Sequence, residues 1–233
     1  MRLDRFLANS GYGTRKEVKK FIKQKRISVN DSFDVKDNQI IDPINDVICF
    51  DGDKIDYQEF YYFLLNKPKG YLSATEDYYE QTVLDLLPEY RHIDLFPVGR
   101  LDKDTTGLLL ITNDGTLAHD LISPKKHVDK VYIATLDKAL DLKIKDEFEH
   151  GIILDDELTL PASLEKIEDN IAKVTIHQGK YHQIKRMFEY FGYKVVELDR
   201  IKFSFLTYDG LEIGEYRELS KEEIERLKSL KSR

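Results

Sequence analysis

The chain has 233 residues, of which 41% are hydrophobic and 34% are charged, and its formal net charge is −7. This length is enough for one large domain, or for a small domain and a medium one, with a buried core. No stretch approaches the roughly 18 consecutive apolar residues that a membrane span needs, and the N-terminus lacks the apolar run of a secretion signal. We therefore expect a cytoplasmic protein that does not associate with membranes.

The cysteine and histidine content argues against a metal site. Cys49 is the single cysteine, so the chain cannot form an internal disulfide, and its apolar surroundings predict a buried side chain. The six histidines show no metal-ligand spacing beside carboxylates. We therefore expect no structural metal.

The acidic average hides a strong segregation of charge along the chain. Residues 1–26 hold nine Lys or Arg against two acids, whereas residues 27–58 hold eight Asp against two Lys. The first segment therefore carries +7 and the second −6. A concentrated positive charge attracts phosphate, so one face of the N-terminal region is suited to nucleic acid.

Two short helices are predicted at the N-terminus. Leu3, Phe6 and Leu7 are spaced for one face of a helix that ends near Gly11. Residues 14–17 then form a capping box, the pattern that starts a second helix.

The second helix is amphipathic. Val18, Phe21 and Ile22 are expected to face a core, and a strand at residues 27–29 follows. The opposite flank of the helix is cationic and consists of Arg15, Lys16, Lys19, Lys20 and Lys23.

A domain boundary is predicted near residue 58, where acidic, turn-rich sequence gives way to a buried aromatic strand at residues 60–65. The predicted domains are residues 1–58 and 59–233. Further strands are predicted at residues 108–112, 131–136, 162–167, 172–177 and 195–205. Further helices are predicted at residues 116–122, 140–150 and 183–191. Because helices interleave with non-repeating strands, the fold class is α+β, with a mainly antiparallel or mixed sheet, flanking helices and a central cleft.

The segment from Gly99 to Leu110 has the composition of an active-site loop. It places Asp102 among basic residues, just before an apolar run that is typical of a buried strand. Gly99 and Gly107 permit the tight backbone turns that such a loop needs. An Asp in a loop commonly just caps a turn, so composition alone does not assign Asp102 a chemical role.

Residues 99–115 read Gly-Arg-Leu-Asp, two residues, Thr-x-Gly-Leu-Leu-Leu, and then Thr-Asn-Asp-Gly. This order resembles the catalytic motif of pseudouridine synthases, specifically the RsuA group, which modifies ribosomal RNA. Residues 65–72, 123–132 and 179–188 are similar to three further motifs of this family. Gln178 stands where the family usually has Glu, which leaves the role of that position open.

The N-terminal region resembles a second family. The N-terminal motifs are similar to those of the S4-like domain, a small RNA-binding domain first seen in a ribosomal protein. They are Arg-Leu-Asp-x-x-Leu at the start, Gly-x-x-x-Arg-Lys leading into the basic helix, and Ile-x-Val-Asn after it. The resemblance implies an α/β RNA-binding domain at residues 1–58, followed by a catalytic domain.

The resemblance to pseudouridine synthases implies four catalytic residues. Asp102 would be a nucleophile or would stabilise developing charge electrostatically, and Lys185 would be its ion-pair partner. Tyr132 would stack on the target uracil or transfer a proton. Arg100 would engage the RNA backbone or help to extrude the nucleotide from its stack. His177 and His182 receive no assigned role.

Contacts with RNA phosphates are expected from basic residues of both domains. These are Arg2, Arg5, Arg15, Lys16, Lys19, Lys20, Lys23, Lys67 and Arg186.

The partner implied by the resemblance is ribosomal RNA, bound by a monomeric enzyme that needs no cofactor or metal. Residues 123–128 and 158–162, and the short C-terminus after residue 217, look closest to enzymes of the small subunit. We therefore expect 16S rRNA in an assembling small subunit as the substrate. A 23S rRNA enzyme and a non-catalytic rRNA-binding or assembly factor are alternatives. A hydrolase of small glycosides is disfavoured because no motif places a second catalytic carboxylate.

Overall fold

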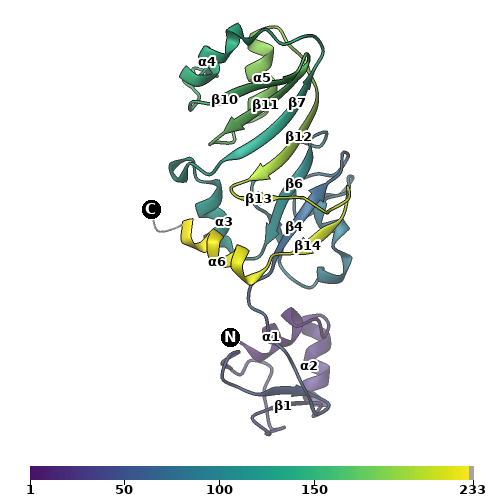
Figure 1. Cartoon of the computed structure of the whole chain (residues 1–233). Coiled ribbons are helices and arrows are strands. Elements are labelled where there is room, and N and C mark those ends of the chain that lie inside the picture. Colours follow the sequence, from purple (N-terminus) through teal and green to yellow (C-terminus); the bar gives the residue numbers. More distant parts are fainter. Residues whose placement is uncertain (231–233) are drawn as a thin grey trace. The chain divides into compact units, whose positions relative to one another are not determined.

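The computed structural model describes residues 1–230, and its chain divides into two compact units (Figure 1). The first unit comprises residues 1–60 together with 87–95, and the second comprises residues 61–86 and the chain from 96 onward. Residues 87–95, which follow the first strand of the predicted second domain, therefore cluster with the N-terminal unit. No helix within residues 1–230 combines the length and apolar character needed to span a lipid bilayer.

The first unit packs two helices on a small antiparallel sheet. Its elements are α1 (Leu3–Asn9), α2 (Arg15–Lys23), β1 (Ile27–Val29), β2 (Ile48–Phe50) and β3 (Asp53–Lys54), with a 3-10 turn η2 (Pro88–Tyr90). The predicted capping box is confirmed, since Thr14 Oγ1 accepts a hydrogen bond from Glu17 N and the Glu17 carboxylate accepts one from Thr14 N. This reciprocal pair satisfies two backbone donors that the start of α2 leaves open.

The core of the first unit contains the apolar faces predicted for both helices, including Leu3, Phe6 and Val18. Phe21 is only partly buried, and its ring packs edge-on against Phe50. Cys49 is also only partly buried, so the prediction of a buried cysteine was wrong. The reason is that β2 is short and only its first residue is fully covered.

The second unit is built on one large mixed sheet, which confirms the α+β fold class. The strands follow the order β10-β11-β7-β12-β6-β4-β14, with β5 beside β6 and β13 beside β12. The β12 and β6 pair is parallel, and the other described pairings are antiparallel. The strands are β4 (Tyr62–Lys67), β5 (Phe96–Pro97), β6 (Thr106–Thr112), β7 (Lys130–Leu136), β10 (Ser163–Glu168), β11 (Ile171–Ile176), β12 (Val195–Phe203), β13 (Leu206–Thr207) and β14 (Tyr216–Glu218).

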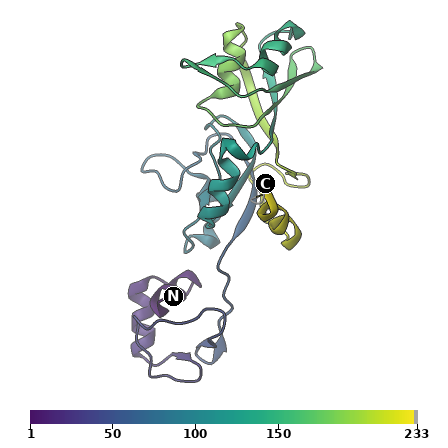
Figure 2. The ribbon, with the colours of Figure 1, turned by 90° about the vertical axis from the view of Figure 1, so that its left-hand side faces the viewer.

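Helices lie at both ends of this sheet (Figures 1 and 2). At the β4 and β6 end, α3 (Gly115–Ile122) and α6 (Lys221–Ser229) contribute to the core that covers these strands. At the other end, α4 (Lys145–His150) packs on β10 and α5 (Gln183–Tyr190) packs on β12. The smaller elements are β8 (Ile153–Leu154), β9 (Glu157–Leu158) and the 3-10 turns η1 (Val83–Leu86), η3 (Pro124–Lys126) and η4 (Leu142–Ile144).

Most predicted elements have bounds that differ by one or two residues in the structure, and three of these differences show their physical cause or extent most clearly. The helix predicted over 140–150 is a 3-10 turn followed by α4, because the Asp141 side chain accepts from Lys143 N and starts the turn after Leu140. The strand predicted over 195–205 ends at Phe203, since Ser204 has a left-handed φ of 55° and the chain reverses into β13. The first strand of the second unit runs to Lys67 instead of residue 65.

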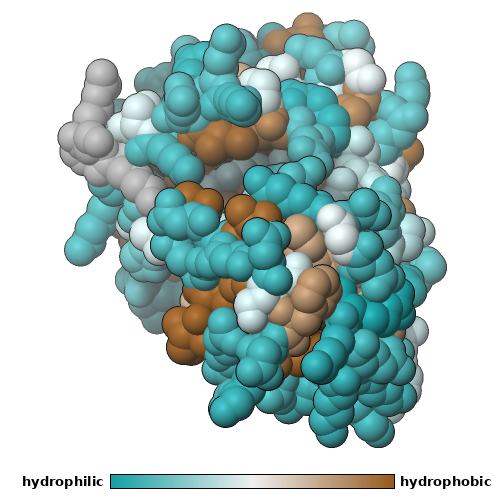
Figure 3. All heavy atoms as spheres, turned by 90° about the horizontal axis from the view of Figure 1, so that it is seen from below, coloured by the Kyte–Doolittle hydropathy of each residue, from teal (hydrophilic) through white to brown (hydrophobic). Residues whose placement is uncertain are grey.

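The chain beyond residue 215 forms two elements that were not predicted from the sequence. These are β14, which extends the sheet beside β4, and α6, whose N-terminus carries a second capping box of Ser220 and Glu223. The side chain of Leu227 is completely buried in the core. Figure 3 shows that hydrophobic patches interrupt a largely hydrophilic surface on the face seen from below.

Candidate active site

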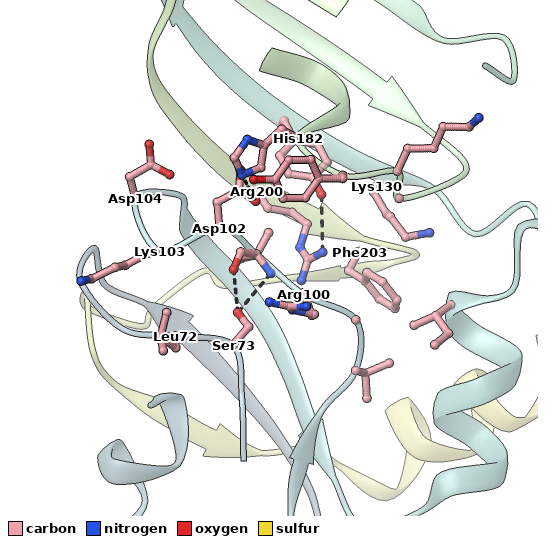
Figure 4. A pocket seen from close by; sticks show the side chains of 18 of the residues that line it. Leu72, Ser73, Arg100, Asp102, Lys103, Asp104, Lys130, His182, Arg200 and Phe203 are labelled. Carbon is pink, nitrogen blue, oxygen red and sulfur yellow. Dashed lines mark hydrogen bonds and ion pairs between the residues drawn. The ribbon is translucent and has the colours of Figure 1, made fainter. Parts of the chain in front are cut away.

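The loop that carries Asp102 lies between β5 and β6, and the Ser73 hydroxyl holds it in place. Ser73 Oγ donates to Leu101 O over 2.9 Å and accepts from Leu101 N over 3.0 Å (Figure 4). Both the hydroxyl and the Leu101 backbone are buried. One side chain therefore satisfies both polar groups of a residue that has no strand partner.

Lys67, at the end of β4, holds the same loop from inside the protein. Its side chain is 0% exposed, and burial lowers its pKa to about 8. The ammonium group donates to backbone carbonyls at 2.9–3.3 Å, those of Pro68, Asp102, Lys103 and Thr105. The prediction that Lys67 contacts RNA phosphate was wrong, because loop carbonyls with no strand partner occupy this ammonium group.

Asp102 lies next to two cationic or protonatable groups. Lys185 Nζ is 2.8 Å from Asp102 Oδ2, and His182 Nε2 is 3.4 Å from Asp102 Oδ1. The predicted ion pair between Asp102 and Lys185 is therefore confirmed. The Asp102 side chain is 26% exposed, so the carboxylate is accessible without being fully hydrated.

Lys185 is shared by a second carboxylate that was not singled out from the sequence. Its Nζ is 2.6 Å from Oδ1 of Asp104, whose side chain is exposed. Burial lowers the pKa of Lys185, but its hydrogen bonds with Asp102 and Asp104 outweigh this effect and raise the pKa above its ordinary value. Lys185 is thus fully charged at neutral pH.

The sequence of α5 explains how Lys185 reaches this loop. Ile184, Met187 and Phe188 are buried, so the helix is fixed on one face and the side chain of Lys185 projects beside that face toward the loop. The helix starts after His182, which has a left-handed φ of 46°. A non-glycine residue in this region costs about 1–3 kcal/mol, so the packing of α5 and the contact with Asp102 hold a strained residue in place.

Tyr132 on β7 faces a buried arginine of the adjacent strand. Arg200 on β12 is its register partner, and Arg200 Nη1 lies 3.5 Å from the Tyr132 hydroxyl. Arg200 Nε donates to Leu108 O on β6 over 2.7 Å. Arg200 was missed from the sequence, although an arginine within an otherwise partly apolar strand was a usable signal.

Gly107 allows β6 to approach β12 at this point. Its φ is 98°, and an added Cβ would lie 2.4 Å from the carbonyl oxygen of Arg200. Only glycine fits such a close approach of two backbones. The parallel contact of β6 and β12 therefore brings the loop of Asp102 next to Arg200 and Tyr132.

These residues border a cavity of about 1050 Å³, large enough for a nucleotide. Asp102, Arg100, His182 and Arg200 line it (Figure 4), and Tyr132 is a further lining residue. Apolar side chains complete the wall, namely Leu72, Val98, Ile122, Pro124 and Phe203. The central cleft predicted from the sequence therefore has a polar part at the Asp102 loop and an apolar part beyond it.

The other predicted RNA contacts are on the surface. Arg186 is engaged by Asp155 through two hydrogen bonds of 2.8 and 2.6 Å, so its phosphate contact stays a prediction. Arg2 pairs with Asp4, and Lys19 pairs with Asp37. The remaining basic residues of this group are exposed on the first unit, and they are Arg5, Arg15, Lys16, Lys20 and Lys23.

His177 and Asp129 lie together near the end of β11, with Nδ1 of the histidine 3.1 Å from Oδ1 of the aspartate. Gln178, the position that departs from the family motif, is buried, and its Nε2 has no partner among the described residues. Within residues 1–230, no group of three or more His, Cys, Asp or Glu residues is placed to hold a metal ion.

Comparison with known families agrees with this geometry. Residues 61–190 match the RNA pseudouridylate synthase family, and residues 1–32 match the S4 domain. The chain belongs to the RNA pseudouridine synthase family, and it carries an S4 domain at its N-terminus.

Individual relatives are similar over nearly the whole length. An uncharacterized RNA pseudouridine synthase of Bacillus subtilis is 46% identical, with 96% of this chain and 97% of the relative covered. The ribosomal small subunit pseudouridine synthase A of Vibrio cholerae is 40% identical, with 96% and 98% covered. The ribosomal large subunit pseudouridine synthase B of Bacillus subtilis is 35% identical, with 98% and 96% covered. A crystal structure of a pseudouridylate synthase aligns with a TM-score of 0.69 at 37% identity, covering 97% of this chain and 99% of that one.

Proposed function

We propose that this protein converts one uridine of small-subunit (16S) rRNA to pseudouridine, with Asp102 acting on the target nucleotide. The small-subunit assignment is supported by identities of 40% and 42% to the small-subunit enzymes of Vibrio cholerae and Yersinia pestis. The large-subunit enzyme of Bacillus subtilis is 35% identical, which keeps 23S rRNA as the alternative substrate.

The observation that carries the assignment of Asp102 is its place in the cavity beside Lys185. The isomerisation breaks the bond between N1 of uracil and C1′ of the ribose, and the electron pair of this bond stays on the base. The base turns, C5 bonds to C1′, the proton on C5 leaves and N1 takes up a proton. An ionised carboxylate suits this reaction as a nucleophile toward sugar or base, or as a stabiliser of positive charge at C1′.

Lys185 supports this role of Asp102 electrostatically. Removing a carboxylate from water without a partner favours its neutral form, which is neither a nucleophile nor an anion. The 2.8 Å contact with Lys185 opposes this effect. Tyr132, with its ring against the same cavity, is suited to stack on the target base.

We further propose that residues 1–58 act as an RNA-binding domain and residues 59–233 as the catalytic domain. The exposed cationic side chains of α1 and α2 are suited to bind phosphates of folded rRNA. Such contacts would offset the few kcal/mol needed to flip the target uridine out of its stack. Arg100, exposed at the cavity, is placed to contact the extruded nucleotide.

The test is a map of pseudouridine in both rRNAs from a deletion strain complemented with wild type or with Asp102→Asn. We expect one 16S site to be lost on deletion, restored by wild type and not restored by Asp102→Asn. With purified protein, Asp102→Asn should form pseudouridine at least about 10³-fold more slowly than wild type, because the substitution removes a charge that acts directly on the substrate. The matched control is Asp104→Asn, which removes the exposed carboxylate on the same lysine and should slow the reaction about fivefold or less.

Each other outcome has a definite meaning. Loss of a 23S site alone refutes the small-subunit assignment. Full activity of Asp102→Asn refutes the assignment of this residue. If no site is lost and the purified protein never forms pseudouridine, the non-catalytic assembly factor becomes the better interpretation.

A further inference from the structure

Arg200, which lines the cavity, has an unused donor group. Its side chain is 2% exposed, and it lines the cavity together with Tyr132 and Phe203. Nε and Nη1 contact Leu108 O and the Tyr132 hydroxyl, whereas the buried Nη2 has no hydrogen-bond partner within residues 1–230. Leaving a buried charged donor unpaired is costly, so such a group indicates a ligand that completes it.

No carboxylate within residues 1–230 forms an ion pair with this guanidinium group. Asp199, the preceding residue, accepts instead from Thr106 Oγ1 and from the Tyr208 hydroxyl, each over 2.6 Å. A second buried cation, Lys130, lies on the same wall, and its Nζ donates to Val128 O over 3.0 Å. Burial, followed by the charge of Arg200, lowers the pKa of Lys130 to about 8. The apolar part of the cavity is therefore electropositive.

The surroundings of Arg200 favour a flat base over a backbone phosphate. Its Cζ lies 5.3 Å from the ring centroid of Phe203 and 6.0 Å from that of Tyr132, so aromatic rings border the guanidinium group (Figure 4). Phosphates stay hydrated along the RNA backbone, whereas the flipped base is the part of the nucleotide that enters a closed pocket. Arg200 is only 2% exposed, so a ligand reaches it only from the cavity that it lines.

We propose that Arg200 Nη2 donates a hydrogen bond to a carbonyl oxygen of the target uracil, O2 or O4, and stabilises the negative charge that this base gains when its bond to C1′ breaks. The inference rests on the proposed function. The electron pair released from the N1–C1′ bond delocalises onto these oxygens and is used again when C5 bonds to C1′, so the charge is transient. A preorganised donor in a pocket that excludes water is most effective against charge of this kind.

The test changes Arg200 in the enzyme and one carbonyl oxygen of the target uridine in the RNA, first separately and then together. The RNA probe is an rRNA fragment that contains the mapped uridine, made with uridine, 2-thiouridine or 4-thiouridine at that position. Sulfur is a weaker hydrogen-bond acceptor than oxygen. Arg200→Lys keeps the positive charge but cannot keep both the anchor on Leu108 and the free donor, so we expect single-turnover formation of pseudouridine to slow about 10²-fold.

The discriminating result is the coupling between the two changes. For one of the two thio-substituted RNAs, the rate ratio of oxygen to sulfur should differ at least about tenfold between wild type and Arg200→Lys. The matched control is Lys166→Gln on β10, a residue that pairs with Asp169 outside the cavity, and it should leave all three rates unchanged. If Arg200 merely positions Tyr132, the rate falls but the oxygen-to-sulfur ratio stays the same for both RNAs, and the proposal is overturned.

Failure of the inference can be told apart from failure of the proposed function. If the wild-type enzyme forms no pseudouridine in any RNA, the proposed function fails first. If Arg200→Lys does not fold, the proposal is tested with the wild-type enzyme instead. A structure of its complex with the uridine fragment must then place O2 or O4 within about 3.2 Å of Arg200 Nη2, and a base turned away from this atom overturns the proposal.

Discussion

The cationic residues of the two units differ in their surroundings, and the difference separates two uses of positive charge. In the first unit, most basic side chains of α1 and α2 are exposed to water. In the second unit, Lys67, Lys130 and Arg200 are buried, and their partners are backbone carbonyls and a tyrosine hydroxyl. Exposed cations attract phosphate at long range and are screened by salt, whereas these buried cations satisfy backbone and hydroxyl groups and fix local structure.

The largest stability effect should follow from removing a buried cation. Lys67→Met removes a donor from four backbone carbonyls, although those of Asp102 and Lys103 still accept from the amides of Thr105 and Gly70. We expect the free energy of unfolding to fall by roughly 3 kcal/mol in urea denaturation. The matched control is Lys69→Met. Lys69 is half exposed and pairs with Glu197, so its removal should cost under about 1 kcal/mol. Equal effects of the two changes would contradict the comparison.

A second test uses pH. The pKa of Lys67 and that of Lys130 are each lowered from 10.5 to about 8 in the folded protein. Between these two pH values the unfolded chain binds more protons than the folded one, so the free energy of unfolding should rise with pH. Lys67→Met should reduce this rise by roughly 1–2 kcal/mol, which is less than the full shift implies because the pH range measured covers only part of the titration. Urea denaturation at several pH values from about 7.5 to 9.5 measures this rise. If the rise is the same in wild type and in Lys67→Met, Lys67 titrates normally in the folded protein.

The smallest effect is expected from the exposed cations. Lys16→Gln or Lys20→Gln should weaken binding of rRNA a few fold and reduce the slope of log affinity against log salt by about 0.7–0.9 for each phosphate that the protein no longer neutralises. Lys36→Gln, in the acidic segment of the same unit, is the control and should change neither quantity. If all three variants show the same affinity for rRNA and the same salt dependence, α2 does not contact the RNA.

Patterns with local causes were predictable from the sequence. The capping box at Thr14 needs only residues close in the chain, and the ion pair between Asp102 and Lys185 followed from two family motifs. The role of Lys67 was not predictable, because a lysine next to Pro68 has the composition of a surface turn. Only the tertiary arrangement shows that the carbonyls of the Asp102 loop surround its ammonium group.

Arg200 shows a second limit of sequence reasoning. Alternation along a strand predicts which side chains share a face, but β12 has register shifts between Val195 and Glu197 and between Arg200 and Lys202. Each shift changes the face on which later residues lie. His182 is similar, because its left-handed backbone, which accompanies the contact with Asp102, has no sequence signal.

The contact between Ser73 and Leu101 has a consequence for the direction of the neighbouring carboxylate. A single point of attachment would fix how far apart two segments are and leave each free to swivel. Attachment through both the amide and the carbonyl of Leu101 also removes rotation about the contact. Because Asp102 follows Leu101 directly, the Ser73 hydroxyl, from a distant part of the chain, fixes the direction of the Asp102 side chain without bound RNA.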